Sequence, residues 1–282
     1  MTKTVYDNRY FEGERSLFGE CDATLTGTTF GPGESPLKHA RNLTLDRVIF
    51  QWKYPLWYCR HVDARNMVFE EMSRSGVWYT DDITLTDSSI QAPKLFRRCK
   101  GVTLEDTHFS DAAETLWTCR EVTMNRVQVN GDYFGKDSSG IKADHLDLVG
   151  NYAFDGASDV TISHSRLISK DAFWNCRNVT ITDSFIDGEY LGWNTSNLTL
   201  ENCTVESDQG LCYIDKLVMR KCRLIHTGLA FEYCSDIDAE IDSEVDSIKN
   251  PISGVIRVGG VGDLIMDPAR IDPSRTDIHV RS

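Results

Sequence analysis

The amino-acid sequence predicts an all-β fold, a single-stranded right-handed parallel β-helix of about twelve coils. Three observations predict it. An apolar-x-apolar triplet recurs every 19 to 21 residues, and another apolar residue nearly always follows seven positions after each triplet start. No segment has the length and periodicity of an amphipathic helix, which excludes a helical solenoid.

The triplet forms the first strand of each coil. Alternation with period two turns two side chains inward and the central residue, usually Thr, outward. The intact copies are Leu43-Thr44-Leu45, Ile83-Thr84-Leu85, Val102-Thr103-Leu104, Val122-Thr123-Met124, Val160-Thr161-Ile162, Val179-Thr180-Ile181 and Leu198-Thr199-Leu200. Divergent copies start at Ala23, Val62, Ile141, Leu217 and Ile237.

The rest of each coil follows from residue types at fixed offsets. Four positions after the start lies a turn rich in Asp, Asn and Gly, which tolerate left-handed backbone: Gly27, Asn66, Asp87, Asp106, Asp183 and Asn202. Three positions before the start, mostly small residues predict a core column: Ala40, Cys59, Thr80, Cys99, Cys119, Ser138, Ala157, Cys176, Thr195, Ile214 and Cys234. The nearest competitor, a leucine-rich repeat, lacks its L-x-x-L-x-L-x-x-N spacing here.

The two ends of such a stack need covering because their strand edges are unpaired. We interpret residues 1–282 as one domain, with an N-terminal cap at 1–20, coils at 21–246 and a C-terminal cap and tail at 247–282.

Composition restricts the partners. The net charge of −13, with no Lys/Arg cluster longer than Arg97-Arg98, argues against nucleic acid and against an anionic membrane surface. The first residues lack an apolar signal region, so a cytoplasmic location is expected. Nine cysteines without a C-x-x-C pair favour reduced thiols, with Cys99 above Cys119 and Cys203 above Cys222 in core columns.

Four strings resemble an uncharacterised bacterial family with a pectin-lyase-like β-helix, classed as a domain of unknown function. They are Gly33-Glu34-Ser35-Pro36-Leu37-Lys38, Trp52-Lys53-Tyr54-Pro55-Leu56-Trp57-Tyr58, Asp132-Tyr133-Phe134-Gly135 and Lys249-Asn250-Pro251-Ile252-Ser253-Gly254. The resemblance covers nearly the whole chain and implies the fold and a bacterial origin. Pectate lyases and polygalacturonases share the wider architecture, but the G-H-G and R-x-K strings of polygalacturonases are absent.

An aromatic stripe is the first candidate site. Five positions before the triplet starts stand Trp57, Trp78, Arg97, Trp117, Lys136, Asp155, Trp174 and Trp193, with Asn175 and Asn194 one position later. Flat rings beside charged and amide groups are typical of a sugar-binding groove. The alternative interpretation is that the rings stack upon one another and stabilise the sheet.

A polar cluster in the preceding turn is the second candidate. It contains Asp132, Tyr133, Asn151, Tyr152, Lys170, Asp171, Glu189 and Tyr190. Hydrolysis would need two carboxylates, for which Asp132, Asp155, Asp171 and Glu189 compete. Lyase chemistry would need a base and a cation, for which Lys170, Lys136 and Arg97 are candidates. The alternative is a solvated polar turn.

Other constellations were weighed. His145 and His164 occupy equivalent turns between Arg126 and Asp183, and Asp183 would have to be the third ligand of a metal pair. A charged surface ladder is favoured because the Arg would repel a cation, so no metal is expected. Nucleotide-binding and serine-hydrolase strings are absent, so no cofactor is expected either.

Two functions remain open. The first is binding of an oligosaccharide or other polyhydroxylated ligand along the stripe, with lyase or hydrolase activity at residues 132–194 as an open question. The second is a non-catalytic scaffold whose aromatic face docks another protein or a second copy, giving a homo-oligomer.

Overall fold

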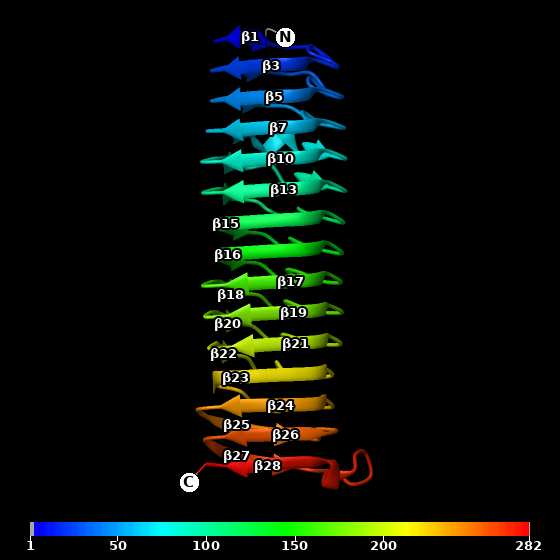
Figure 1. Ribbon diagram of the computed structural model, residues 1–282, viewed down its shortest axis with the longest axis vertical. Helices are drawn as coiled ribbons and strands as arrows, with labels where there is room; N and C mark the ends of the chain where they lie inside the picture. The colour runs from blue at the N-terminus through cyan, green and yellow to red at the C-terminus, as the bar shows by residue number, and fades with distance from the viewer. Residues whose placement is uncertain (1–2, 282) are drawn as a thin grey trace. The chain divides into compact units, whose positions relative to one another are not determined.

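The computed structural model describes residues 3–281. Two compact units divide the chain, residues 1–142 and residues 143–282. Each unit is a right-handed stack of parallel coils, and Figure 1 shows that the strands at its front all run in the same direction. The only helices among the described residues are two 3₁₀ turns, η1 (Glu71–Ser73) and η2 (Pro273–Arg275), so the fold is all-β as predicted. No described helix is long and apolar enough to cross a membrane.

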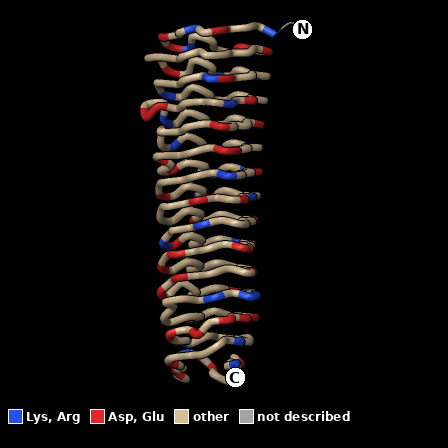
Figure 2. The backbone as a smooth tube through the Cα atoms, turned by 90° about the vertical axis from the view of Figure 1, so that its left-hand side faces the viewer, with Lys and Arg blue, Asp and Glu red and all other residues tan. Residues whose placement is uncertain are grey.

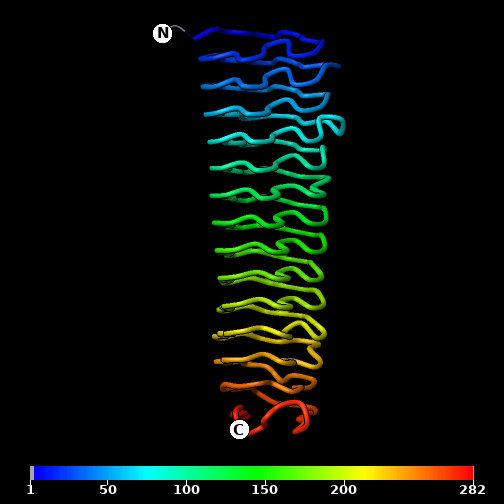
Figure 3. The backbone as a smooth tube through the Cα atoms, turned by 90° about the vertical axis from the view of Figure 1, so that its right-hand side faces the viewer, coloured from blue at the N-terminus to red at the C-terminus, as the bar shows by residue number. Residues whose placement is uncertain are grey.

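The first unit has three strand positions per coil. The first position holds β1 (Thr4–Asp7), β3 (Cys21–Thr26), β5 (Arg41–Asp46), β7 (Arg60–Arg65), β10 (Asp81–Thr86), β13 (Lys100–Glu105) and β15 (Arg120–Asn130). The second holds β2 (Tyr10–Phe11), β4 (Thr29–Phe30), β6 (Ile49–Phe50), β8 (Val68–Phe69), β11 (Ser89–Ile90) and β14 (His108–Phe109). The third holds β9 (Val77–Trp78) and β12 (Phe96–Arg97). The helix η1 widens the coil that Figure 3 draws in cyan.

The second unit repeats this arrangement. After β16 (Ser139–Val149), which begins before the unit boundary, the first position holds β17 (Ser158–Ser163), β19 (Arg177–Thr182), β21 (Ser196–Glu201), β23 (Asp215–Ile225), β24 (Ser235–Ile241), β26 (Gly254–Val258) and β28 (Thr276–Val280). The second holds β18 (Arg166–Ile168), β20 (Phe185–Asp187) and β22 (Thr204–Glu206), while β25 (Glu244–Lys249) pairs with β27 (Gly260–Ile265).

Successive coils pair in register, triplet against triplet. Val102 pairs with Ile83 on one side and with Val122 on the other, and Val179 pairs with Val160 and with Leu198. These triplet residues are fully buried, as predicted. Residues at the same offset from the triplet start therefore lie above one another and form a column along the coils of their unit.

The coil count differs from the predicted twelve. First-position strands number about fifteen among the described residues, because the expected end caps contribute coils of their own. Residues Thr4–Asp7 pair in parallel with β3, and both β26 and β28 lie within residues 247–282. The copies at Thr4, Gly254 and Thr276 do not match the apolar-x-apolar triplet because their first residue is not apolar.

The corners are left-handed backbone. In the coil of Leu43, positive φ angles occur at Ser35 (58°), His39 (65°), Asn42 (54°) and Arg47 (53°). The last is the predicted turn four residues after the start, and Gly27, Asn66, Asp87, Asp106, Asp183 and Asn202 all have positive φ there. A second corner lies four residues before the start, so a left-handed residue directly follows each member of the aromatic stripe.

The core consists of stacked columns. The small residues three positions before each start are buried, and so is the predicted apolar column that includes Phe30, Phe50 and Phe69. These three rings lie at centroid distances of 5.2 Å from one to the next. Cys99, Cys119, Cys203 and Cys222 are buried free thiols, as predicted.

The acidic charge is unequally divided. Residues 1–142 hold 18 Lys and Arg against 20 Asp and Glu, whereas residues 143–282 hold 12 against 23. Figure 2 marks both kinds of residue along the backbone. Most of the net negative charge therefore belongs to the second unit.

Candidate functional site

The tryptophans of the first unit stack on one another and on Arg97. Trp57 and Trp78 are parallel within 8° at a centroid distance of 5.2 Å. The Arg97 guanidinium carbon lies 4.7 Å from the ring centroid of Trp78 and 4.6 Å from that of Trp117. Lys38 completes the column, with its ammonium nitrogen 5.6 Å from the ring centroid of Trp57. This arrangement corresponds to the alternative interpretation, in which the rings stack upon one another and stabilise the sheet.

The indole nitrogens of this column are occupied as well. Each donates to a backbone carbonyl near the start of the next turn: Trp57 to Ser75 at 2.5 Å, Trp78 to Lys94 at 3.2 Å and Trp117 to Tyr133 at 2.7 Å. Both the faces and the polar edge of these half-buried rings are used within the protein. The first-unit tryptophans therefore stabilise the coil stack.

A second ring column lies at the neighbouring left-handed corner. His39, Tyr58 and Tyr79 stack at centroid distances of 5.1 Å and 4.8 Å, and Arg98 donates to the Tyr79 hydroxyl at 3.1 Å. Tyrosine is a costly residue for positive φ, of the order of 1 kcal/mol or more at each corner. Tyr58 and Tyr79 have φ angles of 57° and 58°, and the stacking of their rings offsets part of this backbone cost.

Two shallow grooves beside this corner were missed by the sequence analysis. One of about 380 Å³ contains His39, Arg41, Tyr58, Arg60, Tyr79 and Asp81, and one of about 340 Å³ contains Arg98, Lys100, Thr118 and Arg120. Arg41, Arg60, Lys100 and Arg120 share the position two residues before the triplet start. The recurrence of a basic residue at this offset was the signal that could have revealed the grooves.

Asp132, Tyr133 and Lys136 belong to the first unit. Asp132 is exposed, and its backbone carbonyl accepts a hydrogen bond from the Glu114 amide at 2.9 Å. The Lys136 ammonium nitrogen lies 5.5 Å from the ring centroid of Tyr133. Each has further interactions within the protein. These three candidate residues therefore lie in the first unit, apart in sequence from Lys170, Asp171 and Glu189 of the second.

The tryptophans of the second unit are arranged differently. Trp174 is 37% exposed and Trp193 is 38% exposed. Trp193 stacks on Tyr213 at 5.4 Å and 9°, and Trp174 lies at an angle to Tyr152 at 5.9 Å and 42°. Among the described residues of this unit, no ring stacking joins Trp174 to Trp193. The ladder is therefore interrupted between these two exposed rings.

Amide groups line the corner beside the interruption. The Asn194 side-chain nitrogen donates to the Asn175 side-chain oxygen at 2.7 Å, and Asn175 donates to the Asp155 carboxylate at 3.4 Å. Asn175 and Asn194 are exposed, whereas Asp155 is 6% exposed. The row ends in a carboxylate that fixes the orientation of the amides.

The candidate catalytic charges of this unit are mostly engaged. Lys170 lies 3.3 Å from the Glu189 carboxylate, whose hydrogen bond and charge raise the pKa of Lys170. Asp171 is 7% exposed, and burial raises its pKa, with the nearby Glu189 and Asp155 charges adding to the effect and Lys170 opposing it. The Lys170 ammonium also lies 5.3 Å from the ring centroid of Tyr190. The structure thus gathers Asp155, Lys170, Asp171, Glu189 and Tyr190 in one unit with the exposed tryptophans.

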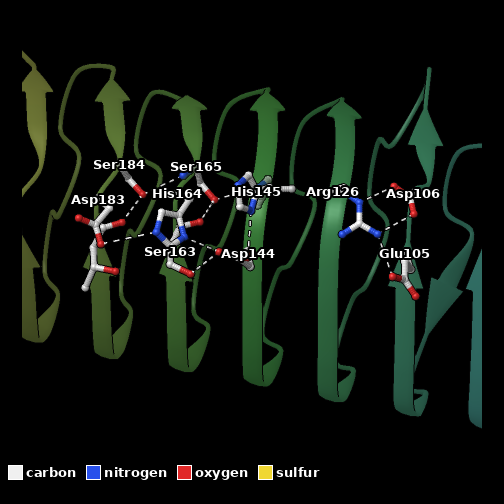
Figure 4. A network of polar contacts seen from close by, with 12 residues as sticks. Glu105, Asp106, Arg126, Asp144, His145, Ser163, His164, Ser165, Asp183 and Ser184 are labelled. Carbon is white, nitrogen blue, oxygen red and sulfur yellow. Dashed lines mark hydrogen bonds and ion pairs between the residues drawn. The ribbon is translucent and has the colours of Figure 1, made fainter.

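A separate polar network surrounds His145 and His164 (Figure 4). The Asp144 carboxylate contacts Nδ1 of His145 at 2.9 Å and Nδ1 of His164 at 2.7 Å, and Ser163 donates to it at 2.7 Å. These three hydrogen bonds hold the pKa of Asp144 well below its usual range, and the bond to Asp144 raises the pKa of His164. The partner of both histidines is thus Asp144, whereas Asp183, expected from the repeat, lies 3.9 Å from Nε2 of His164 alone.

Comparison with solved structures finds low-identity neighbours. A surface adhesin of Streptococcus pneumoniae, PfbA, matches with a TM-score of 0.45 and 9% identity over 93% of this chain and 81% of that one. The Azotobacter vinelandii mannuronan C-5 epimerase AlgE4 A-module has a TM-score of 0.34 and 10% identity over 100% and 89% of the two chains. The periplasmic alginate epimerase AlgG, as a double mutant, has a TM-score of 0.37 and 8% identity over 98% and 75%.

Sequence comparison gives a family and no activity. No curated protein matches the chain. The family model described as "Protein of unknown function (DUF3737)" matches residues 4–279, nearly the whole of the chain. The resemblance noted in the sequence is thereby confirmed, and the protein belongs to the DUF3737 family.

Proposed function

We propose that the protein binds an oligosaccharide without turning it over, at the surface formed by Trp174, Trp193, Asn175 and Asn194. The observation that carries the proposal is the interruption of the ring ladder between the two tryptophans. Both side chains are more than one third exposed, and the ring neighbours of each are tyrosines rather than the other tryptophan. Their mutual separation leaves apolar ring surface for the C–H face of a sugar.

The neighbouring polar groups suit hydroxyl recognition. A sugar hydroxyl both donates and accepts, and a side-chain amide does the same. The Asn194 to Asn175 to Asp155 row is oriented by hydrogen bonds, so its exposed donors and acceptors are fixed before a ligand arrives. Such preorganisation reduces the entropy lost on binding.

Binding is favoured over catalysis by the state of the charged groups. Asp155 and Asp171 are 6% and 7% exposed, which limits their contact with a substrate. The Lys170 ammonium is paired with Glu189, which opposes the loss of a proton that a lyase base would need. These observations favour a surface that holds a sugar over one that cleaves it.

The test is a titration of the full chain with neutral and acidic oligosaccharides, followed by tryptophan fluorescence and calorimetry. Trp174→Ala and Trp193→Ala are expected to weaken binding by roughly ten-fold each, the worth of one aromatic stacking contact. Trp78→Phe is the matched control, because Trp78 is half-buried within the first-unit stack, and it should bind like wild type.

Three outcomes decide the matter. Equal affinity of wild type and both alanine variants would refute the proposed surface. Growth of absorbance near 235 nm with an acidic sugar, or release of shorter sugars, would show lyase or hydrolase activity and refute binding without turnover. Silence towards all sugars, together with an oligomer in which tryptophan exposure falls, would favour the docking scaffold.

The grooves of the first unit favour a second candidate function, binding of an acidic sugar. Four basic side chains from Arg41 to Arg120 share one column, and a single acidic residue, Asp81, lies among them. Arginine and lysine side chains bind the carboxylates of acidic sugars, and the Asp81 carboxylate can accept a hydrogen bond from a sugar hydroxyl. Arg60→Gln and Arg120→Gln should selectively weaken the binding of acidic sugars. An unchanged ratio of acidic-sugar to neutral-sugar affinity in both variants would contradict this candidate.

A further inference from the structure

The His145 and His164 side chains stack in adjacent coils of the second unit. Their ring centroids are 5.2 Å apart with planes inclined by 22°. Both residues occupy left-handed corners, with φ of 53° and 47°, and both side chains are more than half exposed. In-register stacking of coils therefore presents two imidazoles side by side on an accessible surface.

Asp144 supplies a third donor between them. Its carboxylate lies 2.9 Å from Nδ1 of His145 and 2.7 Å from Nδ1 of His164, and one donor atom from each of the three residues lies within 4.8 Å of the others. A tetrahedral ion held at about 2.0–2.2 Å from each ligand requires ligand atoms roughly 3.3 Å apart. The two carboxylate–nitrogen distances are thus shorter by a few tenths of an ångström, and a small outward movement of the exposed imidazoles would open both to that separation.

Outer contacts orient these three donors. Ser163 donates to the Asp144 carboxylate at 2.7 Å, and the Asp183 carboxylate lies 3.9 Å from Nε2 of His164. Without an ion, Nδ1–H of His164 donates to Asp144, and an ion at Nδ1 would replace that proton. The Asp183 carboxylate would then face a proton on Nε2 and favour that tautomer. Figure 4 shows Asp144, Ser163 and Asp183 grouped around His164.

The surrounding charge favours a cation. The adjoining groove of about 530 Å³ contains His145, Asp147, His164, Arg166 and Asp183. Its one cationic side chain, Arg166, is paired with Asp147 at 3.0 Å. The negative charges of Asp144 and Asp183 remain, within a unit that holds 23 acidic against 12 basic residues.

We propose that Asp144, His145 and His164 bind a divalent transition-metal ion, with the two Nδ1 atoms and the Asp144 carboxylate as ligands. The two imidazole donors favour zinc, copper and nickel ions over magnesium and calcium. Three protein ligands leave at least one coordination position for water. The site is distinct from the tryptophan surface and is independent of the proposed sugar binding.

The test uses the full untagged chain, freed of metal with EDTA and titrated calorimetrically with zinc chloride. Wild type is expected to bind one zinc ion. His145→Asn, His164→Asn and Asp144→Asn should each weaken the affinity about ten-fold or more. Asparagine replaces the two histidines because Asn66 and Asn202 occupy the same left-handed corner in other coils, so the backbone tolerates it there. His226→Asn is the matched control, an exposed histidine at positive φ that contacts only Glu206 among the hydrogen bonds described.

A second measurement identifies the ligands. Electron paramagnetic resonance of the protein loaded with one Cu²⁺ should show coupling to two imidazole nitrogens, and the double variant His145→Asn/His164→Asn should lose it. Circular dichroism confirms that the variants are folded. The proposal is overturned if wild type binds no zinc, or if the double variant binds zinc as tightly as His226→Asn.

Discussion

Trp57 and Trp78 stack with their rings parallel within 8° and their centroids 5.2 Å apart, one coil above the other. Arg97 lies on the far side of Trp78, with its guanidinium carbon 4.7 Å from that ring centroid. Among the described residues, Arg97 Nε is buried without a hydrogen-bond partner. The cation–π contacts of the guanidinium with the tryptophan rings compensate for this missing hydrogen bond. The stack is thus a structural element of the first unit.

Removing the middle ring should destabilise the protein. Trp78→Ala removes both stacking contacts and uncovers Arg97, and we expect the free energy of unfolding to fall by about 2 kcal/mol, less than for a fully buried ring. Trp193→Ala, at an exposed ring, should cost about half as much or less. Urea denaturation followed by circular dichroism compares the two. Equal losses would contradict the distinction between the two tryptophan groups.

Asp171 should limit stability at neutral pH. Burial raises its pKa above the ordinary value of 3.8, so the ionised form is penalised in the folded state. Its protonated form stabilises the fold at low pH, and this contribution is lost as pH rises through the raised pKa. Asp171→Asn is therefore expected to unfold at higher temperature than wild type at pH 7 and at the same temperature near pH 3. A lower melting temperature at pH 7 would show that the charge is compensated.

His164 should titrate above its ordinary pKa of 6.5, because its Nδ1 hydrogen-bonds to the Asp144 carboxylate. The charged imidazole then stabilises the fold fully below pH 6.5, and the contribution disappears as pH rises through the raised value. The effect on stability is small because both side chains are exposed. A nuclear magnetic resonance titration in EDTA measures the pKa directly. Asp144→Asn should lower the pKa of His164, and an unchanged pKa would show that Asp144 does not cause the shift.

One of the nine thiols should react rapidly with a disulfide reagent. Cys21 is partly exposed and the other eight cysteines are buried. Burial also raises the pKa of Cys59 to about 12 and that of Cys203 to about 11, which suppresses their reactive thiolates. Cys21→Ser should abolish the fast phase. A fast phase of two or more thiols in folded wild type would mean that some coils open readily.

The residue sequence by itself determined the fold. A triplet such as Val102-Thr103-Leu104 is local, and repetition at 19 to 21 residues places equal offsets in one column. The columns of small residues, of phenylalanines and of left-handed corners were therefore readable without coordinates. The end coils at Thr4, Gly254 and Thr276 were not, because their side chains depart from the pattern while their backbones still pair in register.

Only the tertiary structure decided how the side chains of one column meet. Trp57, Trp78, Trp174 and Trp193 share one offset, yet the first two stack and the last two do not. Likewise Asp144 reaches both His145 and His164, although one lies beside it in sequence and the other 20 residues away. Side-chain torsions and neighbouring coils set these contacts, and neither is encoded in a repeat offset.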